Sequence, residues 1–274
     1  MWIKKKELTE LSENIRKAIA GQEVEFRDNK EGELSILKND MHTLVNIQKE
    51  QENYAKKESE MLSKYLADIS HQLKTPITSM MLMANLLEDA PPQKQQEFIF
   101  NIKSELTHME WLVASLLKMA KLESKTVTFT NTNISVRELL DSSMKPLEIL
   151  LDIKNQHIVL QNDITLACDK RWTIEALTNL LKNASENTPE SKKLVIDSGE
   201  NPIYAFISVT DGGNGITREK LQSLFKRFEN SGNEKGYGIG LPLALAIMRG
   251  QDGDIEVEPG GHGTGATFTM KFYK

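Results

Sequence analysis

Two runs of apolar residues at helical spacing fill the first half of the chain and restrict what it can fold into. The spacing of three or four positions is typical of a coiled-coil seam, and the pair Pro91-Pro92 between the runs predicts a turn joining two long helices. One such hairpin has little to pack against, whereas two form an antiparallel four-helix bundle, so the pattern predicts a homodimer. The runs are Leu62, Leu66, Ile69, Leu73, Ile77 and Met80, then Phe98, Ile99, Ile102, Leu106, Met109, Val113, Leu116 and Ala120.

The pattern changes near Lys125, where helical periodicity gives way to short β-branched or alternating runs. These runs are separated by helical stretches and glycine-rich loops, which predicts a mixed α/β domain. The fold class expected is therefore a helical bundle followed by an α/β domain, with the boundary at 125/126. The predicted strands cover residues 127–130, 157–161, 194–197, 205–210 and 266–273.

Length and charge narrow the function classes. A chain of 274 residues is long enough for about two domains. The 34 basic and 39 acidic residues leave a net charge of -5, which disfavours nucleic acid as a partner. The single cysteine, Cys168, cannot form an internal disulfide. No window holds the roughly 18 consecutive apolar residues that a membrane span needs.

His71 is the residue of the bundle that most suggests chemistry. It lies between the seam residues Ile69 and Leu73, and at about 100° per residue its imidazole is predicted to point out of the bundle. Many such histidines are simply solvated. Here, however, Pro76 removes a backbone N–H, leaves the carbonyl of Gln72 without its helical partner and bends the helix beside the histidine.

Three features of the second half point to a nucleotide. Asn179, Asn183 and Asn187 line one face of a predicted helix, which is either an ordinary polar face or a source of amide oxygens for Mg²⁺. The glycines of residues 211–215 let a planar ligand come close while Asp211 accepts from an exocyclic amine. The glycine-rich turn at residues 236–241 opens a helix whose first N–H groups can bind phosphate oxygens.

In this order the features resemble the cytoplasmic part of bacterial two-component sensor histidine kinases, over residues 47–274. The resemblance implies a dimerisation and phosphotransfer bundle at 47–125 and, at 126–274, an ATP-binding α/β sandwich of the type shared with gyrase and the Hsp90 chaperones. It implies Mg²⁺ and ATP as cofactors and a response-regulator aspartate as acceptor. The matching segments are the phosphoacceptor box at 68–76, the N box at 179–187, the glycine boxes at 211–215 and 236–241, the F box at 224–228 and the loop at 261–265.

Roles for the site residues follow from the resemblance and, for Gln72 and Thr75, from their own chemistry and their places beside His71. His71 is the phosphorylated residue, and Gln72 accepts a hydrogen bond that fixes the imidazole tautomer. Thr75 either holds a water that hydrolyses the regulator's acyl phosphate, which makes phosphatase activity plausible, or is simply tolerated before Pro76. Asn183 is the implied magnesium ligand. The residues implied to hold the nucleotide are Asn179, Lys182, Asn183, Asn187, Asp211, Gly213, Gly215, Phe228, Gly236, Gly238, Gly240, Leu241 and Thr264.

Residues 1–46 resemble a HAMP-type signal linker, with helices expected from Leu8 to Gly21 and from Glu31 to Leu44. Such a linker normally follows a membrane helix. The chain starts with Met1-Trp2-Ile3 and three lysines, which is typical of the cytoplasmic end of a membrane helix. We therefore expect the full-length protein to be membrane-anchored, with this chain as its cytoplasmic portion.

Several positions depart from the family pattern. Gln72 stands where many relatives have an acidic residue, and Glu186-Asn187 and Glu229-Asn230 replace residues that are often basic or aromatic. Glu186 would repel a triphosphate unless it points away or Lys182, Lys226 or Arg227 compensates its charge. Two alternatives stay open: a nucleotide-binding pseudokinase scaffold, and another ATPase or serine kinase on the same fold.

Overall fold

The computed structural model describes residues 5–19, 22, 24, 26, 33–88, 90–228, 238–261 and 264–274. It divides into two compact units, Met1–His71 and Gln72–Lys274, which are described separately. None of the described helices combines the length and the apolar character required to cross a bilayer.

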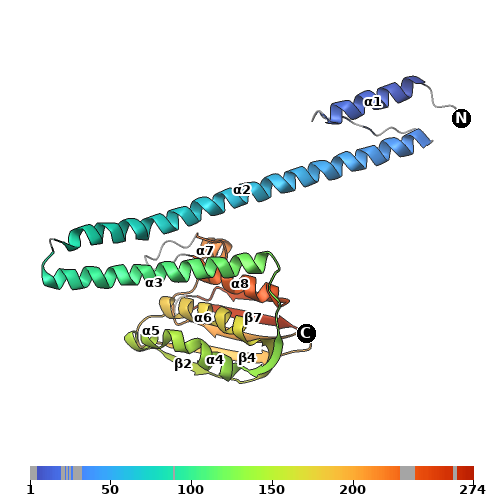
Figure 1. The fold of residues 1–274 in the computed structure, drawn as a ribbon. Coiled ribbons are helices and arrows are strands. Elements are labelled where there is room, and N and C mark those ends of the chain that lie inside the picture. Colours follow the sequence, from blue (N-terminus) through green and yellow to red (C-terminus); the bar gives the residue numbers. More distant parts are fainter. Residues whose placement is uncertain are drawn as a thin grey trace. The chain divides into compact units, whose positions relative to one another are not determined.

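Two helices make up the described part of the first unit. Helix α1 (Lys5–Ile19) and the first part of α2 (Glu33–Leu87) run in the same direction (Figure 1). The second helix expected for a signal linker, from Glu31 to Leu44, is the beginning of a continuous helix. The reason is visible in the sequence, because residues 33–75 contain neither glycine nor proline to stop it. The domain boundary at 46/47 stays a prediction.

The helical hairpin predicted on either side of the proline pair is confirmed. Helix α2 continues through Pro76 to Leu87, and α3 spans Pro92–Glu123. Pro92 opens α3, where the N–H that proline lacks has no helical partner in any case. At the other end, the N–H of Ser124 donates to the carbonyl of Ala120 and ends the helix.

The α/β domain is built on a mixed five-stranded sheet in the order β2-β4-β5-β7-β6. Strand β2 is parallel to β4, and the remaining neighbours are antiparallel. A second sheet pairs β1 with β3. The strands are β1 (Asn131–Ser135), β2 (His157–Leu160), β3 (Thr165–Asp169), β4 (Lys193–Glu200), β5 (Tyr204–Thr210), β6 (Gly253–Glu258) and β7 (Thr267–Tyr273).

Helices cover one face of the five-stranded sheet (Figure 1). Alternate strand residues such as Ile196, Ile207 and Phe268 are fully buried, as are Leu180 of α6 and Leu243 of α8. This alternation places the core between the sheet and the helices. The predicted α/β domain is thus confirmed. Its helices are α4 (Val136–Met144), a 3-10 turn at Lys145–Leu147, α5 (Glu148–Ile153), α6 (Lys170–Asn187), α7 (Arg218–Ser223) and α8 (Gly240–Gly250).

One predicted strand is wrong. Residues 127–130 belong to no strand, and the first strand is the next segment, β1. The phenyl ring of Phe129 packs against Trp172, with ring centroids 5.9 Å apart. The N–H of Thr130 donates to the carboxylate of Asp169 over 2.9 Å. The segment is therefore held by an aromatic contact and a side-chain hydrogen bond and not by a strand partner. Strands β3 and β6 were not predicted.

Candidate functional site

The carboxylate of Asp211 is fixed by backbone groups at the end of β5. The side chain is 6% exposed, and its Oδ1 accepts the N–H of Gly213 over 2.8 Å and the N–H of Ala266 over 3.1 Å. The N–H of Asp211 itself donates to the carbonyl of Ala266 over 3.0 Å. Both bonds to the carboxylate use Oδ1, so Oδ2 takes part in neither of them. The second oxygen is thus the one that can accept from a ligand.

Two glycines allow this packing. A Cβ on Gly213 would stand 2.6 Å from the carbonyl oxygen of Asn187. Gly265 has φ +68°, and a Cβ there would stand 1.9 Å from the carbonyl oxygen of Asp211. No side chain fits at either place without moving backbone. The glycines therefore set the position of Asp211 against both α6 and the last strand.

Helix α6 places its three asparagines between the two glycine segments, the first at residues 211–215 and the second at residues 238–241. Asn179 is 7% exposed, and its Nδ2 donates to the carbonyl of Glu175 over 2.9 Å. Its Oδ1 lies 3.0 Å from the position that a Cβ of Gly240 would take, so a side chain there would crowd the amide of Asn179. One helical turn apart, Nδ2 of Asn187 donates to the carbonyl of Asn183 over 2.8 Å and reaches Oδ1 of Asn183 at 3.3 Å.

These contacts bring most of the predicted site residues together. Asn179 meets the beginning of α8 at Gly240, and Asn187 meets the first glycine segment at Gly213. Gly215 approaches the loop before β7, because a Cβ on it would lie 2.6 Å from the carbonyl oxygen of Pro259. The two glycine segments and the asparagine face therefore border one region of the domain.

The second glycine segment leads into the first turn of α8. Gly238 has φ +64°, and its carbonyl accepts the N–H of Phe228 over 3.2 Å. Phe228 is 9% exposed, and Leu241 is buried at the start of α8. The N–H groups of this first turn precede any helical partner and can bind phosphate oxygens. Gly236, Glu229 and Asn230 lie outside the described residues.

Thr264 holds its own loop. Its Oγ1 accepts the N–H of Gly261 over 2.8 Å and lies 3.1 Å from the carbonyl oxygen of the same residue. The side chain is exposed. The hydroxyl thus closes a tight turn directly before the segment that supports Asp211.

Sequence reasoning missed residues that anchor the carboxyl end of α6. Thr188 is 2% exposed, and its Oγ1 accepts the N–H of Gly212 over 2.9 Å. Nε2 of Gln156 donates to the carbonyl of Thr188 over 2.7 Å, and Nζ of Lys154 donates to that of Ser185 over 2.7 Å. Of these residues, only Thr188 could have been suspected from the sequence, because it directly follows the asparagine face.

Helix α3 contacts the α/β domain beside this region. Nζ of Lys182 lies 4.9 Å from the ring centroid of Trp111, and Lys118 forms an ion pair with Glu175 at 2.7 Å. Arg227 forms an ion pair with Glu123. Burial raises the pKa of Glu123 and lowers the pKa of Arg227. Two of the side chains expected to compensate Glu186 therefore contact α3.

The predicted phosphoacceptor residues lie on α2. His71 is exposed in the single chain, and it is the last residue of the first unit. That its imidazole points out of a bundle stays a prediction, because seam residues such as Leu66 are exposed in the single chain too. In the second unit Gln72 is half-buried, Thr75 is exposed and Pro76 is buried. Among the described residues, no three His, Cys, Asp or Glu side chains gather as a metal site. Magnesium prefers oxygen ligands, which the amide of Asn183 and the phosphates of a nucleotide can provide.

Two family models match the chain. Residues 61–125 match the His Kinase A (phospho-acceptor) domain, and residues 168–274 match the Histidine kinase-, DNA gyrase B-, and HSP90-like ATPase family. The first segment contains the exposed histidine and the helical hairpin. The second contains the asparagine face, both glycine segments and the buried aspartate.

Two relatives from Bacillus subtilis extend over most of the chain. Sporulation kinase C is 29% identical over 72% of this chain and 45% of its own length. Sensor histidine kinase WalK is 27% identical over 76% of this chain and 36% of its own length. The chain thus spans less than half the length of each of these two relatives.

Two solved structures show the same fold at low identity. The histidine kinase ThkA in complex with the response regulator TrrA has a TM-score of 0.65 and 22% identity, covering 83% of this chain and 66% of that one. Full-length ShkA in complex with AMPPNP has a TM-score of 0.57 and 22% identity, covering 77% of this chain and 46% of that one.

Proposed function

The chain belongs to the sensor histidine kinases, whose phosphoacceptor and ATP-binding domains it carries in that order, and we propose that it phosphorylates itself on His71. The phosphoryl group then passes to an aspartate of a response regulator. The observation that carries the proposal is the Asp211 carboxylate, which is fixed through Oδ1 and lies beside the asparagine face of α6 and the first turn of α8. The same chain exposes a histidine on a helical hairpin.

Nucleotide binding follows from the residues around Asp211. Oδ2 of Asp211 accepts a hydrogen bond from the exocyclic amine of adenine, and the first N–H groups of α8 bind phosphate oxygens. The amide oxygen of Asn183, with Asn179 beside it, would hold a magnesium ion, which neutralises phosphate charge when bound. The AMPPNP complex of ShkA supports ATP as the ligand.

His71 supplies the nucleophile. A neutral imidazole nitrogen attacks the γ-phosphorus, the bond from phosphorus to the bridging oxygen breaks, and ADP leaves. Gln72 accepts a hydrogen bond from the other ring N–H and so fixes the tautomer, but it cannot take up the proton as a carboxylate would. The resulting phosphoramidate is labile enough to pass its phosphoryl group to a carboxylate.

The partners are a response regulator and a second copy of this chain. The complex of ThkA with TrrA supports the regulator. The dimer is supported by the apolar seam, whose Leu62, Leu66 and Leu106 are each more than half exposed in the single chain. Burying these side chains against a second hairpin completes a four-helix bundle. Phosphatase activity through Thr75 stays a prediction.

The proposal extends to the HAMP-type linker and to the membrane. The parallel course of α1 and the first part of α2 supports a linker of two helices (Figure 1). Membrane anchoring of the full-length protein rests on the sequence of Met1-Trp2-Ile3, which lies outside the described residues. A cytoplasmic position for this chain is proposed on the same ground.

The decisive experiment incubates the chain with labelled ATP and Mg²⁺. We expect phosphate that is labile in acid and stable in base, present in the unmodified chain and absent in His71→Ala. His108→Ala is the matched control, because His108 is an exposed histidine on the other helix of the hairpin and should leave labelling unchanged. Acid-stable phosphate, or no phosphate at all, would show that the chain is a serine kinase or a nucleotide-binding scaffold.

A further inference from the structure

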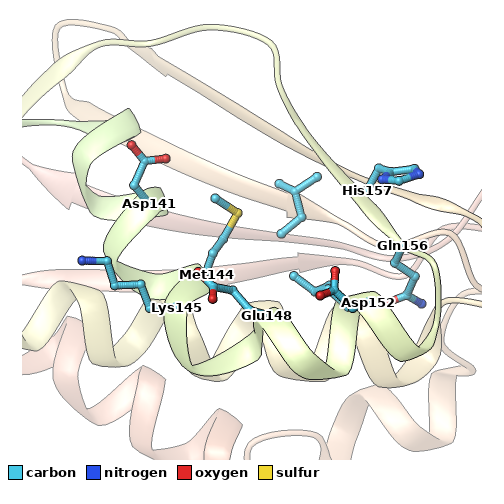
Figure 2. A pocket seen from close by; sticks show the side chains of 9 residues that line it. Asp141, Met144, Lys145, Glu148, Asp152, Gln156 and His157 are labelled. Atoms are coloured by element: carbon cyan, nitrogen blue, oxygen red, sulfur yellow. The ribbon is translucent and has the colours of Figure 1, made fainter.

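A groove lies on the α/β domain between the α4–α5 segment and strand β2. Its volume is about 500 Å³. Met144, Leu151 and Ile158 form its apolar part, and Asp141, Glu148 and Asp152 add three carboxylates from the helical side. Figure 2 shows Asp141, Met144, Lys145, Glu148 and Asp152 on the helical side of the groove, with His157 on its other side. None of these residues belongs to the nucleotide site proposed above.

Strand β2 is an edge strand with one open side. Within the described residues it is hydrogen-bonded to β4 alone. The N–H of Gln161, just beyond the strand, donates to the carbonyl of Ile196 in β4. Because backbone groups alternate along a strand, Ile158 and Leu160 direct their N–H and carbonyl groups away from β4. A peptide that enters the groove therefore meets backbone groups able to pair with it.

The charge of the groove selects among possible peptides. Three carboxylates line it against the single ammonium of Lys145. Two of them, Glu148 and Asp152, are four residues apart and lie on one side of α5. A peptide strand paired with β2 directs alternate side chains to the helical face of the sheet, where basic side chains would meet these carboxylates. Its other side chains point to the opposite face.

We propose that this groove binds an extended basic segment of a partner protein, which adds to the sheet as a strand beside β2. Main-chain hydrogen bonds to Ile158 and Leu160 supply register, and the carboxylates of Asp141, Glu148 and Asp152 select lysine or arginine. Since only two residues of β2 direct backbone groups outward, the bound segment is short, on the order of five residues. The occupant proposed is thus a second protein, recognised by its basic side chains.

The test measures binding of a fluorescent peptide with alternating lysine and valine to the full chain, without ATP. We expect saturable binding that weakens as salt is added. Glu148→Lys should weaken it by about fivefold or more, because one attraction is replaced by a repulsion. Glu258→Lys is the matched control, since Glu258 is exposed on β6 at the opposite edge of the sheet and its reversal changes the net charge equally. It should leave binding unchanged.

Two further peptides separate edge pairing from simple charge attraction. A peptide of the same sequence methylated on its inward backbone nitrogens should bind at least about fivefold more weakly, because it loses donors to β2. A peptide with glutamate in place of lysine should not bind. The proposal is overturned if the methylated or acidic peptide binds equally well, or if Glu148→Lys has no effect. A shift of the chain from dimer to monomer in Glu148→Lys would identify the occupant as a second copy and would also overturn it.

Discussion

At the scale of single residues, Asp211 offers a substitution that separates structure from binding. Asp211→Asn keeps Oδ1 as an acceptor for the N–H groups of Gly213 and Ala266, so the local fold should persist. It replaces the second oxygen by an NH₂ group, which cannot accept from adenine. We expect nucleotide affinity to fall on the order of 10- to 100-fold, the range for loss of a hydrogen bond to a charged group.

Titration with a fluorescent ATP analogue measures this loss, and thermal unfolding without nucleotide provides the control. Unchanged affinity in Asp211→Asn would remove Asp211 from base recognition. A large fall in the unfolding temperature would instead assign it a structural role.

Whether a site residue could be predicted from the sequence depended on how far along the chain its hydrogen-bond partner lies. Asp211 and Asn179 stand in short motifs whose chemistry is readable from neighbouring positions. Gln156 and Lys154 act on the end of α6 about 30 positions further along the chain, with separations of 32 residues from Gln156 to Thr188 and 31 from Lys154 to Ser185. Nothing near Gln156 or Lys154 in the sequence indicates that contact.

At the scale of elements, α3 is tied to the α/β domain through Lys182 and Arg227. Trp111 holds Lys182 by a cation–π contact, and Trp111→Ala would release that ammonium toward the neighbouring asparagine face. Because such a contact contributes about 0.5–2 kcal/mol, we expect ATP to bind about two- to thirtyfold more tightly in the variant.

Equilibrium binding of labelled ATP measures the effect of Trp111→Ala. Lys121→Ala serves as control, since it removes an exposed side chain from the same helix. Equal or weaker binding in Trp111→Ala would mean that Lys182 does not contribute to phosphate binding.

Helices and strands were predictable where the residues that specify them are close together in the sequence. The unbroken helical period and the proline pair specify α2 and α3, and the asparagine helix is specified by its own spacing. Strand β1 begins Asn131-Thr132-Asn133, with little intrinsic strand propensity, and it exists because it pairs with β3 in the register Asn131 to Asp169. Because β3 lies 30 or more residues further along the chain, the sequence of β1 itself has no pattern that indicates this pairing.

At the scale of the whole molecule, the proposed four-helix bundle predicts that labelling of His71 requires two copies of the chain. Leu66→Glu would place a charge where the proposed bundle buries a leucine that is 58% exposed in the single chain. We expect the dimer dissociation constant to rise by at least about tenfold, with loss of His71 labelling at concentrations where the unmodified chain is dimeric.

Sedimentation equilibrium measures the association, with Lys64→Glu as the control, because Lys64 lies about 200° around the helix from Leu62 and also from Leu66. A dimer that persists unchanged in Leu66→Glu would show that this seam is not the interface. The order of bundle and α/β domain was predictable from the sequence. The apolar seam also predicts that two copies pair, and this stays a prediction because the structure holds a single chain.

The glycines around Asp211 have a thermodynamic consequence for any ligand of that carboxylate. A surface aspartate that meets a ligand must first give up its rotational freedom, which costs about 0.5–1.5 kcal/mol for an immobilised side chain. Here the hydrogen bonds from Gly213 and Ala266, which the glycines at 213 and 265 make room for, have removed that freedom during folding. The entropy is lost once, when the domain folds, and not again each time a nucleotide binds or leaves.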